Sequence, residues 1–319
     1  MEHPTEQQKI VITGALGHIG SQLLRALPEA FPNAEIVLVD DLSTQRYSSL
    51  FKLPEHGRYR FIEADVLNAD LDGLFSGARV VIHLAAITNA AGSFENAARV
   101  EQTNYTGTER VAHACLRSGA ALLFLSTTSV YGTQAEVVDE SCGESELQPQ
   151  SPYAESKLRA EQLLEVLGRK EGLRYVTCRF GTIFGPSPGM RFHTAVNKFI
   201  WQACVGVPLT VWRSALDQRR PYLDLQDAVR AIEFIIARDQ FDRQVYNVLT
   251  VNATVREIIE AIRRSVPDLT VSLVDARIMN QLSYTVSCER FCALGFRFSG
   301  DLQLRIDESV ALLRGVRQW

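Results

Sequence analysis

Tyr153 and Lys157 are the side chains whose types and spacing best suit acid–base chemistry. They stand four residues apart in the segment SPYAESKLRAEQLL, so they share one face of a helix that we expect to begin near Pro152. A nearby ammonium favours the phenolate and lowers a phenol pKa that starts near ~10, which makes Tyr153 a candidate base. The same spacing also fits a buried ring beside a solvated charge, so the pair acquires a function only within a ligand site.

A glycine-rich turn near the start of the chain predicts such a site. The apolar residues 10–13 run into Gly14, Gly17 and Gly20, a GxxGxxG spacing that closes a strand and opens a helix. These glycines permit a tight turn, backbone contact with a pyrophosphate and close helix packing, and the helix N-terminus faces the anion. Asp40 follows Gly20 by twenty residues, where a carboxylate binds ribose hydroxyls and repels a 2′-phosphate. The two features together predict NAD as the cofactor, whereas a plain turn beside a solvated Asp40–Asp41 pair is the alternative.

The elements that must position these residues alternate between short apolar runs and longer stretches of helical period. This alternation predicts an α/β fold with a Rossmann-like, doubly wound parallel sheet and a smaller C-terminal substrate-binding lobe. Strands are expected at residues 9–13, 36–39, 60–63, 80–84, 121–126, 175–179 and 245–248, and helices at 20–30, 96–118, 153–171, 196–204, 227–238, 254–265 and 306–313. We expect residues 1–180 to form the NAD-binding domain, with 222–250 returning to it, and 181–319 to form mainly the substrate lobe.

Composition excludes several classes of protein. The chain has 319 residues with 33 Lys and Arg against 37 Asp and Glu and no long block of one charge, which argues against nucleic acid as a partner. No apolar stretch approaches the ~20 residues of a membrane helix, and the N-terminus lacks a targeting pattern. The six Cys are scattered without a CxxC pair, so neither a metal site nor a disulfide framework is expected. We therefore expect a cytoplasmic protein without a membrane partner.

Four ordered segments then carry a resemblance to a known family. TGALGHIG, HLAA at 83–86, STTSVYG at 126–132 and YAESK resemble the extended short-chain dehydrogenase/reductase family, in particular its nucleotide-sugar epimerase and dehydratase branch. The resemblance implies that Tyr153 is the base, that Lys157 is its electrostatic partner and anchors the nicotinamide ribose, and that Thr127 hydrogen-bonds the reacting hydroxyl. It also implies a nucleotide-diphosphate sugar as the substrate and a homodimer.

Further site residues follow from the same resemblance. Asp65 and Val66 correspond to an adenine-contacting pair, and Ala85 and Ala86 to the wall beside the cofactor. His18 and Ile19 lie within the phosphate loop, where His18 is expected mainly to pack. The residues expected to contact substrate are Thr127, Thr128, Thr182, Arg191, Arg220 and Arg277, with Arg220 the first choice for the diphosphate because a guanidinium offers planar donors.

Departures from the family pattern narrow the expected chemistry. Sugar 4,6-dehydratases of this branch carry Asp-Glu directly after the catalytic Thr, whereas this chain has Thr128 and Ser129. Uronate epimerases place an Arg at the position of Gly189, and here Arg191 follows two residues later. We therefore expect NAD-dependent C4 epimerisation of an NDP-hexose or NDP-hexuronate. A 4,6-dehydratase, a uronate decarboxylase, a dehydrogenase that releases NADH and a non-catalytic NAD-binding regulator remain the alternatives.

Overall fold

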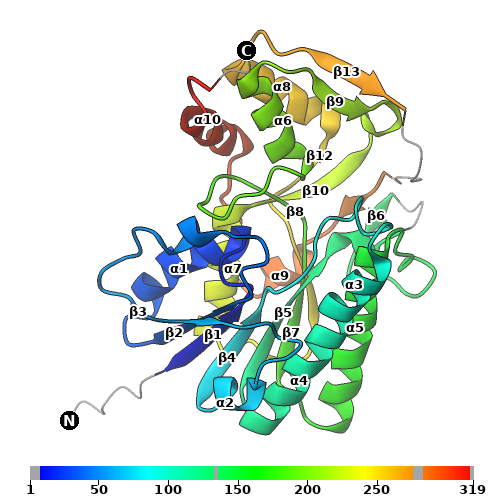
Figure 1. The fold of residues 1–319 in the computed structure, drawn as a ribbon. Helices are drawn as coiled ribbons and strands as arrows, with labels where there is room; N and C mark the ends of the chain where they lie inside the picture. The colour runs from blue at the N-terminus through cyan, green and yellow to red at the C-terminus, as the bar shows by residue number, and fades with distance from the viewer. Residues whose placement is uncertain (1–7, 133–135, 276–282, 317–319) are drawn as a thin grey trace.

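A seven-stranded parallel sheet forms the centre of the computed structural model, which describes residues 8–132, 136–275 and 283–316. The strand order is β11-β7-β5-β4-β1-β2-β3, and every pair is parallel (Figure 1). The bounds are β1 Lys9–Thr13, β2 Glu35–Asp40, β3 Arg58–Glu63, β4 Ala78–His83, β5 Ala121–Thr127, β7 Tyr175–Phe180 and β11 Val245–Val248. Reversal of the order at β1 and β4 gives the doubly wound topology, so the predicted fold class is confirmed.

Helices cover both faces of this sheet, as Figure 1 shows. On one face α1 (His18–Ala30) packs beside α7 (Leu225–Ala237), and α9 (Glu289–Ala293) contacts β11. On the other face lie α2 (Leu71–Phe75), α4 (Gly107–Ser118) and α5 (Pro152–Lys170), with α3 (Ala97–Glu101) against α5. A single helix was expected over 96–118, and it contains a π-helical turn at Gln102–Thr106. Each face has its own apolar core, which fixes the carboxyl ends of the strands.

A second lobe stands above the carboxyl ends of the strands (Figure 1). Its helices are α6 (Ala195–Val205), α8 (Val255–Ser265) and α10 (Leu302–Leu312), and they pack around a separate apolar core. Its strands form the sheet β12-β10-β8 and the pair β13-β9, a set that the apolar periodicity of the sequence does not show. Their bounds are β8 Thr182–Phe184, β9 Leu209–Trp212, β10 Arg219–Asp224, β12 Val251–Thr254 and β13 Val271–Val274, and a short pair joins β6 (Val137–Val138) to β14 (Thr285–Val286).

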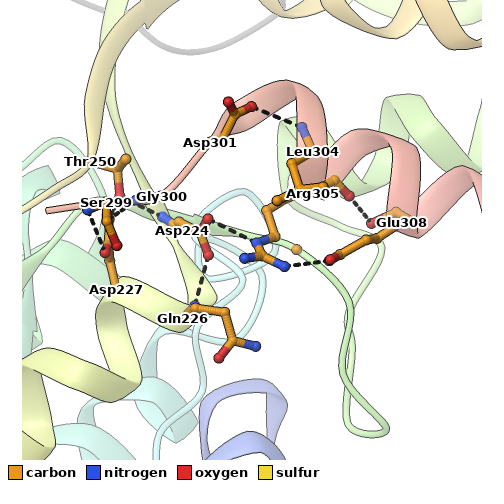
Figure 2. Close-up of polar contacts among 12 residues, drawn as sticks. Asp224, Gln226, Asp227, Thr250, Ser299, Gly300, Asp301, Leu304, Arg305 and Glu308 are labelled. Atoms are coloured by element: carbon orange, nitrogen blue, oxygen red, sulfur yellow. Dashed lines mark hydrogen bonds and ion pairs between the residues drawn. The ribbon is translucent and has the colours of Figure 1, made fainter.

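Two buried aspartates tie α10 and the segment before it to the junction of the lobes (Figure 2). Asp224 ends β10 and caps α7, and its Oδ2 accepts from Arg305 Nε at 3.0 Å. Asp227 accepts four hydrogen bonds, from Arg230 Nη2 (2.6 Å), Gly300 N (2.9 Å), Thr250 Oγ1 (2.8 Å) and Ser299 N (3.0 Å). The C-terminal segment is therefore held by charge-assisted bonds to the first turn of α7.

Across the described ranges, no helix is both long enough and apolar enough to cross a membrane.

Candidate functional site

A cavity of about 760 Å³ lies between the carboxyl ends of the central strands and the second lobe. Ligands of doubly wound sheets bind in this position, where the strand order reverses. The cavity brings together every predicted site residue that the structure describes, namely Gly14, Gly17, His18, Ile19, Gly20, Asp40, Asp65, Val66, Ala85, Ala86, Thr127, Thr128, Tyr153, Lys157, Thr182, Arg191 and Arg220. Arg277 lies outside the described residues.

The phosphate loop depends on glycine at two positions. Gly14 has φ +65°, and a Cβ atom there would lie 2.6 Å from the backbone N of Ala85, so only glycine fits beside the end of β4. A Cβ atom on Gly20 would lie 2.3 Å from the carbonyl oxygen of Ala15, so Gly20 allows the first turn of α1 to pack on the loop itself. The loop therefore leads into a helix N-terminus that borders the cavity, an arrangement suited to a dinucleotide pyrophosphate.

A loop of the second lobe lies directly on this phosphate loop. The ring Nε2 of buried His18 lies 2.8 Å from the carbonyl oxygen of Gly185, and because a carbonyl only accepts, Nε2 carries the proton. Burial lowers the pKa of His18 to about 3, so the ring is neutral near pH 7. A Cβ atom on Gly189 would lie 2.5 Å from the carbonyl oxygens of Leu16 and Gly17, which leaves no room for a side chain at that position.

Asp40 lies at the end of β2 with both carboxylate oxygens in use. Its Oδ2 accepts from Leu16 N at 2.9 Å and its Oδ1 from Leu42 N at 3.0 Å. Burial raises the pKa of Asp40, and these two N–H groups lower it in part. The carboxylate is thus fixed beside the phosphate loop, and its remaining lone pairs can accept from ribose hydroxyls. Asp65, Val66, Ala85 and Ala86 continue the same wall of the cavity.

Tyr153 and Thr127 meet at the carboxyl end of β5. Helix α5 begins with Pro152 at its first position and is capped by Ser151, whose Oγ accepts from Ala154 N at 3.2 Å. Tyr153 therefore sits in the first turn, where its phenol lies beside Thr127 in the cavity wall. Burial raises the pKa of the Tyr153 phenol, while the Thr127 hydroxyl and the charge of Arg191 lower it in part. Without a further positive charge the phenol keeps its proton.

Lys157 is one turn further along α5 and is 3% exposed. Its Nζ donates to the carbonyl oxygen of Leu125 at 2.8 Å and lies 4.7 Å from the ring centroid of Phe124. Burial lowers the pKa of Lys157 to about 7, and the charge of Glu161 raises it in part. Lys157 can therefore gain or lose its proton near neutral pH, which adds or removes a positive charge on the same helix face as the Tyr153 phenol.

The far end of the cavity holds the residues expected to contact a substrate. Thr182 begins β8 and pairs with Tyr222 of β10, which places Arg220 two residues away on the same wall. The Arg220 guanidinium lies over the ring of Tyr284, 4.9 Å from its centroid. Tyr284 Oη in turn donates to the carbonyl oxygen of Thr128 at 3.1 Å. Arg220 is thereby held against the segment that follows Thr127.

Arg191 of the second lobe lies in the cavity wall near Tyr153. Its Nη1 donates to Thr88 Oγ1, whereas its buried Nε has no partner among the described residues. Burial and the charge of Arg46 lower the pKa of Arg191 to about 10, and the proximity of Tyr153 raises it in part. A buried N–H without an acceptor in the wall of a cavity is a natural contact for a ligand oxygen.

Tyr284 and Arg46 line the cavity but were not predicted from the sequence. Tyr284 comes from a segment distant from the motifs and is brought in by the pairing of β14 with β6. Arg46 follows Asp40 by six residues in an irregular loop, and its charge acts on Asp40 and Arg191. Its position six residues after Asp40 is the feature of the sequence that could have indicated Arg46 as a site residue.

The fold and the cavity together define a dinucleotide-binding enzyme of the doubly wound α/β class. The chain belongs to the NAD dependent epimerase/dehydratase family, whose model matches residues 10–248. This confirms the family resemblance and the prediction of NAD, and the Gly14–Gly20 loop and Asp40 fit that cofactor.

Two curated relatives represent two reactions of the family. A Bacillus subtilis protein named as an uncharacterized UDP-glucose epimerase, YtcB, is 32% identical over 249 residues, which cover 75% of this chain and 76% of the relative. A trifunctional Arabidopsis thaliana protein, whose activities begin with UDP-glucose 4,6-dehydratase, is 29% identical over 302 residues. That match covers 91% of this chain but 45% of the plant protein, so the chain spans less than half of its length.

Solved structures with the same fold include two named as 4-epimerases. UDP-N-acetylglucosamine 4-epimerase from Methanobrevibacter ruminantium, in complex with UDP-N-acetylmuramic acid, has a TM-score of 0.83 and 26% identity and covers 96% of this chain and 98% of its own. UDP-glucose 4-epimerase from Thermus thermophilus, in complex with NAD, has a TM-score of 0.83 and 25% identity and covers 97% and 99%. The family thus includes both epimerases and dehydratases, and the choice between them must come from the site residues.

Proposed function

We propose that this protein is an NAD-dependent 4-epimerase that inverts C4 of an NDP-hexose or NDP-hexuronate through a transient 4-keto sugar. The observation that carries the proposal is the placement of the Tyr153 phenol beside Thr127 at the cavity wall, with Lys157 one helical turn from Tyr153. A sugar hydroxyl that replaces part of this contact would meet a proton acceptor and a second hydroxyl together.

Tyr153 is the base in this proposal. Because burial raises its pKa, the phenol gives up its proton only when positive charge gathers beside it. Lys157 supplies one such charge, and bound NAD⁺ supplies a hydride acceptor that also carries positive charge. Tyr153 would take the proton of the C4 hydroxyl while the C4 hydrogen is held as hydride by the dinucleotide, and would return that proton after the ketone has turned over.

The residues after Thr127 favour epimerisation over dehydration. Elimination of water across C5 and C6 needs an additional acid and base near the sugar. The two positions that follow Thr127 hold Thr128 and Ser129, whose hydroxyls are poor acids and bases at neutral pH. Simple removal and return of a hydride at C4 needs no further acid.

The diphosphate end of the substrate is assigned to Arg220. Tyr284 holds its guanidinium by a cation–π contact, so the planar donors are oriented before a ligand binds. Binding energy at this remote end allows the hexose itself to be held loosely, which a ketone that must rotate requires.

A hexuronate is favoured by one specific observation. The unpartnered Nε of Arg191 lies in the wall near Tyr153, and a C6 carboxylate is the sugar substituent that an arginine fork would bind most strongly. Gly189 cannot be replaced by a longer side chain, because the loop backbone already touches the phosphate loop. In this proposal Arg191 therefore takes the role that the family pattern gives to position 189.

The test is turnover of an NDP-sugar panel followed by NMR of the products in heavy water. UDP-, GDP-, CDP- and dTDP-linked hexoses and hexuronates are compared, and we expect a 4-epimer without solvent deuterium at C5. Tyr153→Phe is expected to lower kcat by about 10²- to 10⁴-fold while NAD binding is retained. Unchanged turnover of Tyr153→Phe would refute the assignment, and deuterium at C5 or accumulating NADH would replace epimerisation with dehydration or net oxidation.

A further inference from the structure

A buried ion pair lies beside the reacting groups and was not predicted from the sequence. Glu161 of α5 and Arg179 of β7 have side chains that are 6% and 5% exposed. Arg179 Nη2 donates to Glu161 Oε2 at 2.7 Å, and its Nε lies 3.1 Å from both carboxylate oxygens. This two-pronged contact fixes the orientation of the carboxylate.

Glu161 completes a regular pattern of contacts between α5 and the end of β5. Three side chains at successive four-residue steps of α5 meet three consecutive residues of β5. Tyr153 lies beside Thr127, Lys157 donates to the carbonyl oxygen of Leu125, and Glu161 accepts from Ser126 Oγ. The helix thus holds each residue of the strand end that carries Thr127, and Glu161 supplies one of the three attachments.

The charged and titratable groups around Lys157 give Glu161 a second effect. On α5 itself Lys157 has Tyr153 before it and Glu161 after it. From β4 comes His83, whose pKa burial lowers to about 3 so that the ring is neutral, and from β7 comes Arg179, whose charge is paired with Glu161. The carboxylate of Glu161 therefore opposes the effect of burial on Lys157, raising its pKa.

Burial of such a pair is not explained by stability alone. A buried ion pair usually contributes no more to folding than apolar residues of similar volume, because both charges lose their hydration. Arg179 also donates to the hydroxyl of Tyr131 at 2.9 Å, so the charges belong to a wider buried network. Its bonds end on Ser126 and Tyr131, which line the cavity where the reaction is proposed to occur.

We propose that Glu161, oriented by Arg179, is a positioning residue that holds the Thr127 end of β5 and places a negative charge one helical turn from Lys157. This inference rests on the proposed function, because it assigns Glu161 an effect on proton transfer at Tyr153. Glu161 itself touches no reacting atom. It acts through Ser126 and Lys157.

The first test is the pH profile of kcat/KM for Glu161→Gln. Glutamine keeps the volume and an acceptor for Ser126 but removes the charge, so Lys157 loses its proton at lower pH. We expect the alkaline limb to move down by about 1 to 3 pH units, the range that a nearby opposite charge produces. At neutral pH we expect kcat to fall by roughly 10-fold or more, with a smaller change in KM. Asp224→Asn, which breaks the other buried ion pair, is the matched control and is expected to leave the limb in place.

A second measurement follows the protonation of Lys157 directly and needs no turnover. The chain has five lysines, so the side-chain NMR signal of Lys157 in isotope-labelled protein can be assigned by its loss in Lys157→Met. In Glu161→Gln the titration midpoint of this signal should fall in the NAD-bound protein. If Glu161→Gln does not fold, the double variant Glu161→Gln, Arg179→Met leaves no unpaired charge and should show the same direction of change.

The outcomes separate this inference from the proposed function. A lower midpoint for Lys157 in a protein that turns over no NDP-sugar would uphold the electrostatic effect and refute the epimerase. An unmoved midpoint and an unmoved alkaline limb in a folded Glu161→Gln would overturn the inference while leaving the epimerase intact. An equal shift in Asp224→Asn would also overturn it, because the effect would then be that of any lost buried charge.

Discussion

Two buried networks of carboxylate and arginine differ in where their hydrogen bonds end. The bonds of Glu161 and Arg179 lead to Ser126 and Tyr131, which line the cavity. The bonds of Asp224 and its neighbour Asp227 lead instead to helix N-termini, to Thr250 and to the segment before α10 (Figure 2).

The difference teaches that similar bonds can border the cavity in one place and join the two lobes in another. Asp224 has 0% side-chain exposure and Arg305 17%, and neither lines the cavity. Damage to that network should therefore lower stability and spare the site. Damage to the Glu161 network should lower both the stability of the fold and turnover at the site.

The largest expected effect on stability comes from removing the arginine of each pair. Arg179→Met leaves Glu161 buried with Ser126 as its remaining donor, and we expect the free energy of unfolding to fall by about 3 to 5 kcal/mol. Arg305→Met should cost less, about 1 to 3 kcal/mol, because Asp224 keeps the N–H of Gln226 at 2.8 Å. Urea unfolding of both variants measures the two losses. Equal losses, or a larger loss for Arg305→Met, would contradict the view that Glu161 depends more on its arginine than Asp224 does.

Much of the fold behind these networks could be predicted from the sequence. Strands of the parallel sheet are continuous apolar runs, so their limits were placed within about two residues, as for β1 and β7. The strands of the second lobe were missed because they are short and lack a continuous apolar run. In β10, for example, the sequence RRPYLD is half polar and contains Pro221, which argues against a strand.

The site was predictable where chemistry follows local spacing. Spacing along the chain is enough to identify Tyr153 with Lys157 and Gly14 with Gly20. Glu161 also stands four residues after Lys157, so the helical period could have indicated it. Tyr284 could not be predicted, because its place beside Arg220 depends on how β14 pairs in three dimensions.

A smaller effect is expected from crowding the network that Figure 2 shows. A Cβ atom on Gly300 would lie 2.4 Å from Asp224 Cβ and 2.7 Å from Asp227 Oδ2. Gly300→Ala should therefore lower the free energy of unfolding by about 1 to 3 kcal/mol without changing kcat. Gly143→Ala is the control, because a Cβ there meets no atom closer than 3.8 Å. Equal stability of the two variants would contradict the role of the Asp224 and Asp227 network in stability. Lost turnover in Gly300→Ala would contradict its separation from the site.

The smallest effect, and the sharpest form of the comparison, uses one hydroxyl in each network. Ser126 Oγ donates to Glu161, and Thr250 Oγ1 donates to Asp227 Oδ2 at 2.8 Å. Ser126→Ala and Thr250→Ala each remove one bond to a buried carboxylate, so each should lower the free energy of unfolding by about 1 to 2 kcal/mol.

Turnover should separate the two variants even where stability does not. Ser126→Ala releases one of the three attachments between α5 and the end of β5, so Thr127 is held less firmly and kcat should fall several-fold with little change in NAD affinity. Thr250→Ala should leave kcat unchanged, because the lost hydroxyl bonds only to Asp227 and to the backbone N of Asp224, and neither residue lines the cavity. Steady-state kinetics beside urea unfolding gives both numbers for each variant. Equal loss of turnover would mean that general stability, and not the position of Thr127, limits the reaction.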